Sequence, residues 1–158
     1  VLGVTQSAFG DWKDQYLDTV PILHLARDVE HAVAQFQPSV VYTHHGGDLN
    51  ADHRCVAEAV LVACRPQPGH CVKRILHFEV PSSTEWGAGW MGRFDPAHFV
   101  DIAETLGTKL RAMSCYVDEV REPPHPRSIE AIQWLAKWRG ACVGLSAAEA
   151  FMVTRTIC

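Results

Sequence analysis

Residues 40–54 read Val40-Val41-Tyr42-Thr43-His44-His45-Gly46-Gly47-Asp48-Leu49-Asn50-Ala51-Asp52-His53-Arg54. The apolar run at residues 40–42 leads through this stretch into a helix-like segment, residues 55–64, which predicts a strand, a loop and a helix in succession. Three histidines and two aspartates therefore crowd the end of a strand, where open α/β sheets bind their ligands. Imidazole and carboxylate groups suit zinc and related metals, so the junction predicts part of a metal site.

A second interpretation of this loop needs no metal. Asn50 or Asp52 can cap the following helix, because Asn and Asp are ordinary residues at helix starts and in loops. His44 and His45 are adjacent, so at a strand end their side chains point to opposite faces and are poorly placed to share one ion. His53 lies just inside the helix, where it can reach back over the sheet edge, and Asp52 can orient its ring or that of a neighbour. The residues alone leave both interpretations open.

With its flanks, the loop resembles the second motif of the PIG-L/LmbE-like family of zinc-dependent N-deacetylases. That motif places an Asp several residues before an Asp-His pair at a helix start, and here it reads Asp48-Leu49-Asn50-Ala51-Asp52-His53-Arg54. The similarity continues in four later stretches, which are Glu79-Val80-Pro81-Ser82-Ser83-Thr84-Glu85-Trp86, His125-Pro126-Arg127-Ser128, Arg139-Gly140 and Ala148-Glu149-Ala150-Phe151. This ordered set covers essentially the whole chain and is more specific than the Asp-His pair alone.

The resemblance implies roles for the loop residues. His53 is the expected metal ligand for zinc or another divalent metal, and Asp52 is the expected neighbour that tunes its hydrogen bonding. The family usually has a histidine two residues before this Asp, as donor to the developing oxyanion, and the present chain has Asn50 there. An amide donates a hydrogen bond but cannot deliver a proton at neutral pH, so His44 or His45 is an alternative donor. The expected catalytic residues are Asp52, Asn50 and His45.

The family's first motif, an Ala-His-Pro-Asp-Asp-Glu run, supplies two further zinc ligands and the catalytic carboxylate, and nothing in this sequence matches it. Because a catalytic zinc normally has three protein ligands, His53 alone predicts an enzyme that is impaired or inactive in this chain. We therefore expect residues 1–158 to form a single PIG-L/LmbE-like domain that is N-terminally incomplete. The implied reaction is metal-dependent removal of an N-acetyl group from a sugar, such as N-acetylglucosamine, or a sugar-containing metabolite. The alternatives are a non-catalytic sugar-binding module and an inactive fragment.

The loop that follows the strand predicted over residues 72–80 is expected to bind substrate. The four residues expected to do so are Ser83, Thr84, Glu85 and Trp86. Hydroxyl, carboxylate and indole groups hold a sugar by hydrogen bonds and by stacking on its C–H face. A solvated loop with one anchored tryptophan explains the composition equally well, and the resemblance favours substrate contact. Arg127 is also expected to contact substrate, although its Pro-rich segment is typical of a structural turn. A Ser-His-Asp hydrolase is a third possibility, but no Gly-x-Ser-x-Gly elbow occurs.

The apolar spacing predicts alternating helices and strands: helices over residues 22–37, 55–64, 103–120 and 128–139, and strands over residues 39–43, 72–80, 99–100 and 150–153. The expected fold is an α/β three-layer sandwich with a Rossmann-like, mostly parallel sheet that lacks its first strand. A missing strand would expose a sheet edge, which predicts self-association into a homo-oligomer. Trp134 and Trp138, four residues apart on a helix, are expected to pack in the core.

The composition is that of a globular protein, with 47% hydrophobic and 20% charged residues. The net charge of −4 and the lack of a Lys/Arg cluster make nucleic acid and anionic membrane poor partners, and no apolar run is long enough to span a bilayer. The six cysteines form no Cys-x-x-Cys pair and are expected to be free thiols of a cytoplasmic protein. The expected partner is a small N-acetylated sugar.

Overall fold

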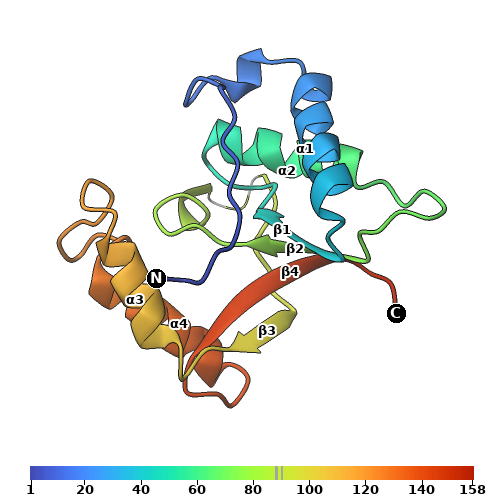
Figure 1. Cartoon of the computed structure of the whole chain (residues 1–158). Helices are drawn as coiled ribbons and strands as arrows, with labels where there is room; N and C mark the ends of the chain where they lie inside the picture. The colour runs from blue at the N-terminus through green and yellow to red at the C-terminus, as the bar shows by residue number, and fades with distance from the viewer. Residues whose placement is uncertain (88, 90) are drawn as a thin grey trace. The chain divides into compact units, whose positions relative to one another are not determined.

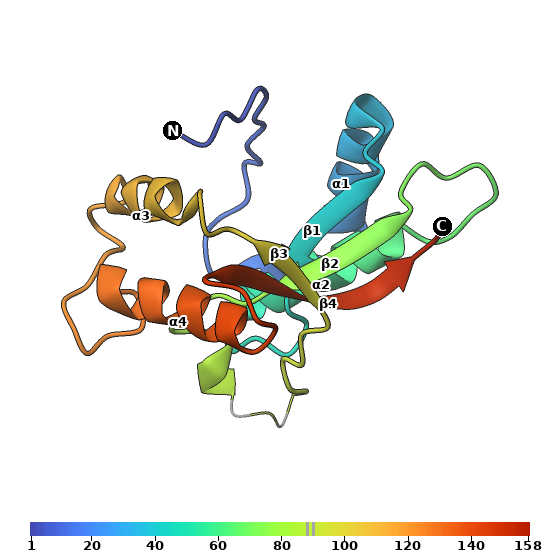
Figure 2. The ribbon, with the colours of Figure 1, turned by 90° about the horizontal axis from the view of Figure 1, so that it is seen from below.

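The computed structural model describes residues 1–87, 89 and 91–158, which form two compact units (Figures 1 and 2). Unit 1 consists of Val1–Phe9 and His98–Ala150, and unit 2 consists of Gly10–Ala97 and Phe151–Cys158. Within the sequence between residues 81 and 92, which is predicted to be a loop, Ala88 and Trp90 lie outside the described residues. No helix in the described part of the chain is long and apolar enough to cross a membrane. All six cysteines are free thiols.

Four strands form one sheet in the order β1-β2-β4-β3, and they are β1 (Val40–His44), β2 (Arg74–Phe78), β3 (His98–Asp101) and β4 (Ala148–Thr156). The α/β class and the flanking of the sheet by helices are confirmed. β1 and β2 run parallel with Tyr42 opposite Leu76, because the helix between them returns the chain in the same direction. β4 runs antiparallel to β2 with Met152 opposite His77. The sheet is therefore mixed rather than mostly parallel.

Unit 2 is built on two helices that pack against each other, α1 (Ile22–Phe36) and α2 (Ala51–Ala63) (Figure 1). Both helices bury apolar side chains in one core with the sheet. This core contains Val33 of α1, Val60 of α2 and Ile75 of β2. Arg155 of β4 donates a hydrogen bond of 2.7 Å to the carbonyl oxygen of Cys64, the C-cap residue of α2. The end of β4 therefore fastens the end of α2.

Unit 1 contains α3 (Leu106–Ser114) and α4 (Ile129–Ala141), which pack against each other (Figure 2). Leu106 of α3 and Ala136 of α4 share a core with Ala147. The helix predicted over residues 103–120 is shorter than expected. Its end tightens into a turn in which the N–H of Cys115 donates to the carbonyl of Ala112, three residues earlier.

The prediction that Trp134 and Trp138 pack in the core is wrong. Their residues are 62% and 65% exposed, because α4 turns a different stripe inward. That stripe is Ile132, Ala136 and Gly140, at i, i+4 and i+8. Its small residues allow close approach: a Cβ atom on Gly140 would lie 2.7 Å from the Cα atom of Ala147.

Candidate active site

The site begins at the junction of β1 and α2. Asn50 is the N-cap residue of α2, and its side-chain oxygen accepts hydrogen bonds from the backbone N–H groups of Asp52 (2.8 Å) and His53 (3.4 Å). Such a cap satisfies N–H groups that have no partner within the helix. Of the capping residues that the sequence allows, Asn50 is the one used. It starts α2 at Ala51, four residues before the predicted start, and places His53 in the first turn.

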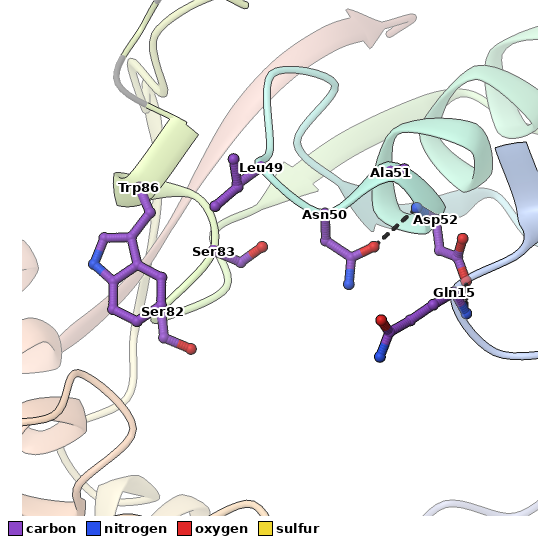
Figure 3. A pocket seen from close by; sticks show the side chains of 8 residues that line it. All are labelled: Gln15, Leu49, Asn50, Ala51, Asp52, Ser82, Ser83 and Trp86. Carbon is purple, nitrogen blue, oxygen red and sulfur yellow. Dashed lines mark hydrogen bonds between the residues drawn. The ribbon is translucent and has the colours of Figure 1, made fainter.

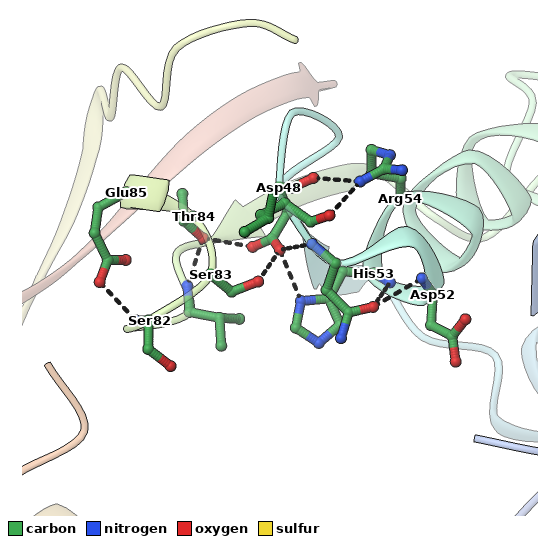
Figure 4. A network of polar contacts seen from close by, with 11 residues as sticks. Asp48, Asp52, His53, Arg54, Ser82, Ser83, Thr84 and Glu85 are labelled. Carbon is green, nitrogen blue, oxygen red and sulfur yellow. Dashed lines mark hydrogen bonds and ion pairs between the residues drawn. The ribbon is translucent and has the colours of Figure 1, made fainter. Parts of the chain in front are cut away.

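A fully buried carboxylate, Asp48, organises the junction (Figure 4). It accepts hydrogen bonds from the N–H of Asn50 (2.9 Å) and from Nδ1 of His53 (3.1 Å). It also accepts from the hydroxyl groups of Ser83 and Thr84, which follow β2. Burial raises the pKa of this carboxyl, but the four hydrogen bonds lower the pKa by more, to well below its ordinary value. Asp48 is therefore a carboxylate that joins the two loops following β1 and β2.

His53 is oriented by this carboxylate. An ionised carboxylate only accepts, so Nδ1 of His53 carries the proton of this hydrogen bond and Nε2 takes no part in it. The ring of His44 stacks on the ring of His53, with 4.1 Å between centroids and 18° between planes. A carboxylate on one nitrogen of an imidazole is the usual support of a metal-binding histidine. His53 is thus prepared to bind a metal ion through Nε2.

His44 is neutral near pH 7. Burial, together with the neighbouring ring of His53, lowers its pKa to about 4, although Asp48 acts in the opposite direction. Its Nδ1 is buried and has no hydrogen-bond partner among the described residues. The backbone at His44 is also held, because Nδ1 of His77 lies 2.7 Å from its carbonyl oxygen. His77 itself is buried, and its Nε2 lies 2.6 Å from the hydroxyl of Thr154.

No hydrogen bond joins Asp52 to the ring of His53 among the described residues, and the catalytic role expected for Asp52 stays a prediction. Its two carboxylate oxygens accept hydrogen bonds from the backbone N–H groups of Gln15 (2.7 Å) and Leu17 (3.0 Å). Consecutive residues of a helix do not face one another, so Asp52 and His53 point to different sides of α2. The orienting role that the resemblance gives to Asp52 belongs to Asp48 in the structure.

A pocket of about 370 Å³ opens beside the helix start (Figure 3). Its lining residues come from three segments of unit 2, and they are Gln15, Leu49, Asn50, Ala51, Asp52, Ser82, Ser83 and Trp86. The structure thus brings together four residues that the sequence predicts for the site, Asn50, Asp52, Ser83 and Trp86. Gln15 and Ser82 line the same pocket without a predicted role. The amide nitrogen of Asn50 points into the open space, since its oxygen caps the helix.

Four other predicted residues of unit 2 lie outside this lining, and the expected metal ligand His53 is one of them. Thr84 donates its hydroxyl hydrogen to Asp48 (2.7 Å), and Glu85 accepts a hydrogen bond from the N–H of Ser82 (2.6 Å). Both therefore shape the loop instead of lining the pocket. His45 is buried, with Nε2 3.3 Å from the carbonyl oxygen of Gly92. It is not among the residues that line the pocket.

Arg127 lies in unit 1, where its guanidinium group forms an ion pair with Glu119. The chain around it is fixed by a second contact, in which the N–H of Arg127 donates to Nδ1 of His125 (3.0 Å). These contacts agree with the structural turn that the Pro-rich segment predicts. A role of Arg127 in binding substrate stays a prediction.

The described residues of the site do not provide a complete set of metal ligands. Across residues 1–87, 89 and 91–158, no cluster of three His, Cys, Asp or Glu side chains could hold a metal ion. His53, backed by Asp48, fits the part of a single ligand. A catalytic zinc normally needs three protein ligands, so the described residues by themselves do not fit the expected cofactor.

Comparisons with known proteins bear on this site. Residues 1–64 match the model of the PIG-L family, described as GlcNAc-PI de-N-acetylase. The match includes the loop and the start of α2, so the predicted resemblance to this family is confirmed for that part of the chain. No functionally curated protein matches the chain in sequence.

Several solved structures share the fold. A conserved protein from Thermus thermophilus has 20% sequence identity and a TM-score of 0.71, over 93% of this chain and 64% of its own. The N,N'-diacetylchitobiose deacetylase of Pyrococcus horikoshii has 16% identity and a TM-score of 0.63, over 91% and 55%. A 4-carboxy-2-hydroxymuconate hydratase from Pseudomonas putida has 18% identity and a TM-score of 0.61, over 86% and 60%.

These matches establish the fold, and the fold hosts more than one reaction, since one of the three proteins is a hydratase. The chain spans 55–64% of the length of these structures.

Proposed function

We propose that this chain, which matches the PIG-L family over residues 1–64, is part of a metal-dependent N-deacetylase that acts on an N-acetylated sugar. The observation that carries the proposal is the Asp48–His53 pair. A buried carboxylate on Nδ1 leaves Nε2 of His53 as a ligand for zinc or another divalent metal. The rest of the ligand set, and the base that the family's first motif supplies, would come from polypeptide beyond these residues.

The pocket at the start of α2 suits a sugar that carries an acetamide group. It offers the hydroxyl of Ser82, the indole of Trp86 and the amide nitrogen of Asn50 (Figure 3). Sugars bind through hydrogen bonds to such groups and by stacking a C–H face on an aromatic ring.

Asn50 is the chain's own candidate for the donor to the acetamide oxygen. Its side-chain oxygen is committed to the cap of α2, which fixes the amide and aims its nitrogen at the pocket. A preorganised donor of this kind, when its hydrogen bond strengthens in the transition state, contributes about 3–4 kcal/mol. The carboxylate of Asp52 also lines the pocket. Its two oxygens accept hydrogen bonds from the backbone N–H groups of Gln15 and Leu17, so its part in the site is to hold that backbone against α2.

A second function, sugar binding without hydrolysis, is favoured by one observation. No three-ligand cluster exists among the described residues, so these residues by themselves offer no complete metal site. Such a module would bind N-acetylglucosamine in the same pocket, with no metal dependence and no product.

One experiment separates the two functions. N-acetylglucosamine is titrated by calorimetry into the protein together with the polypeptide that completes the ligand set, with zinc and with a chelator, and released acetate is measured in the same samples. The deacetylase predicts zinc-dependent acetate release that His53→Ala abolishes. The control His31→Ala removes an exposed histidine of α1 and leaves both readouts unchanged. Binding without acetate in either condition supports the sugar-binding module, and no binding in either condition contradicts both functions.

A further inference from the structure

Asp52 connects two segments that are far apart in sequence. Its carboxylate, in the first turn of α2, accepts hydrogen bonds from the N–H groups of Gln15 and Leu17 (2.7 and 3.0 Å). Both oxygens are used, one for each N–H group. Hydrogen bonds to an ionised acceptor are about twice as strong as neutral ones. Asp52 therefore fastens residues 15–17 to the helix that carries His53.

The fastened stretch belongs to a longer segment, residues 12–20, that lies on α1 and α2. At its start, Nε1 of Trp12 donates to Asp28 of α1 (2.7 Å). At its end, Leu17 and Val20 pack against the core cluster that α1 and α2 share. Asp52 acts between these two anchors, where the segment passes the pocket.

Gln15 adopts an unfavourable backbone conformation in this segment. Its φ is +59°, in the left-handed region that residues other than glycine rarely adopt. Such conformations persist where surrounding contacts enforce them, and they are concentrated at functional sites. Here the enforcing contact is the hydrogen bond from the N–H of Gln15 to Asp52. The result is that the side chain of Gln15 lines the pocket across from Ser82 and Trp86 (Figure 3).

We propose that Asp52 is a positioning residue whose carboxylate holds Gln15 in the pocket, and that Gln15 is a specificity-determining residue for the sugar. This inference rests on the proposed function. The amide of Gln15 has both a donor and an acceptor, so it suits a hydroxyl of the sugar ring away from the acetamide group. Gln15 is therefore expected to favour an acetamide ligand whose ring carries hydroxyl groups over an acetamide ligand whose ring is a plain hydrocarbon.

The position of the segment is tested without any ligand. Trypsin cleaves after Lys13, inside the segment, and faster when the segment leaves α2. Asp52→Ala is expected to raise the cleavage rate at Lys13 by at least about tenfold, because two charge-assisted hydrogen bonds are lost. Asp52→Asn, which keeps one oxygen, is expected to give a smaller increase. The control Asp18→Asn removes an exposed carboxylate nearby and leaves the rate unchanged. An unchanged rate in Asp52→Ala overturns the role of Asp52.

The role of Gln15 is tested by calorimetric titration with N-acetylglucosamine and with N-acetylcyclohexylamine, which lacks the ring hydroxyls. Gln15→Ala is expected to weaken sugar binding about fivefold, the loss of one neutral hydrogen bond, without changing the affinity for N-acetylcyclohexylamine. Gln15→Gly is expected to weaken sugar binding equally while it raises Tm, because glycine tolerates the positive φ. A residue with only a structural role would not separate affinity from stability in this way.

The outcomes distinguish this inference from the proposed function. If the unaltered protein does not bind N-acetylglucosamine, the proposed substrate class and the role of Gln15 both fail, while the cleavage rates still decide the role of Asp52. If the sugar binds and Gln15→Ala leaves its affinity unchanged, the role of Gln15 is overturned and the proposed function stands.

Discussion

Replacement of Asp48 by asparagine tests whether this carboxylate holds the site together. The side chain is fully buried and accepts four hydrogen bonds, three of them at Oδ1. Asparagine keeps an oxygen there, but a bond to a charged acceptor contributes about 1.5–3 kcal/mol and a bond to a neutral one about 0.5–1.5. Three weakened bonds predict that Asp48→Asn lowers the free energy of unfolding by about 3 kcal/mol at pH 7, with departures from additivity in so tight a cluster.

The difference in stability between the unaltered protein and Asp48→Asn is expected to depend on pH. The pKa of Asp48 is lower in the folded protein than in the unfolded chain, so the carboxylate stabilises the fold fully above about pH 5 and loses this effect as the pH falls from there through the folded pKa. The gap between the unaltered protein and Asp48→Asn is therefore constant from about pH 5 to 7 and narrows below that range. Urea unfolding followed by tryptophan fluorescence measures it, and equal m-values confirm comparable transitions.

A matched control is Asp95→Asn, the same chemical change at an exposed position of unit 2, which is expected to change stability by less than about 0.5 kcal/mol. A stability of Asp48→Asn within about 1 kcal/mol of the unaltered protein at pH 7, or a gap that stays constant down to about pH 3, would refute the reasoning.

Four further outcomes are expected. Trp138→Ala changes the free energy of unfolding by less than about 1 kcal/mol because its side chain is exposed, whereas Leu106→Ala costs about 2–5 kcal/mol, and urea unfolding distinguishes the two. Gly140→Ala destabilises by about 1–3 kcal/mol in the same assay, since its Cβ atom has no room. In chelator, stability falls as the pH drops from 6.5 to about 4, because the unfolded chain protonates His44 before the folded protein does, and His44→Gln reduces this slope. Asn50→Asp keeps the cap but loses the amide donor, so Tm is retained while calorimetry shows weaker binding of N-acetylglucosamine.

Much of the fold is readable from local patterns. The apolar spacing before Pro38 gives α1 almost to the residue, and the run at residues 40–42 gives β1. Such patterns indicate which face of a helix or strand is buried. They are less informative where two faces of one helix both carry apolar residues. On α4, the tryptophans at i and i+4 suggest one buried face, while the small residues Ala136 and Gly140 form the face that packs closely. Close approach of backbones favours small residues, and this signal was present in the sequence.

The candidate site is readable only in part, because its decisive contacts are long-range. His53 and the cap at Asn50 follow from residues next to each other in the chain. The partners of Asp48 at Ser83 and Thr84 lie 35 and 36 residues away, so the sequence shows the carboxylate without showing what it binds. Gln15 meets Asp52 across 37 residues through its backbone N–H, which leaves no side-chain signal at all.

The division of the chain has a consequence for its biosynthesis. Unit 2 consists of Gly10–Ala97 and Phe151–Cys158, so 53 residues (98–150) are translated between its two parts. At about 5–20 residues per second the ribosome needs about 3–10 s for them. During this time the backbone of β2 that pairs with β4 lacks its partner strand, and the C-terminus of α2 lacks Arg155. An unpaired strand edge is prone to pair with other nascent chains. Slower translation of residues 98–150 should therefore lower the yield of folded protein and raise its dependence on chaperones.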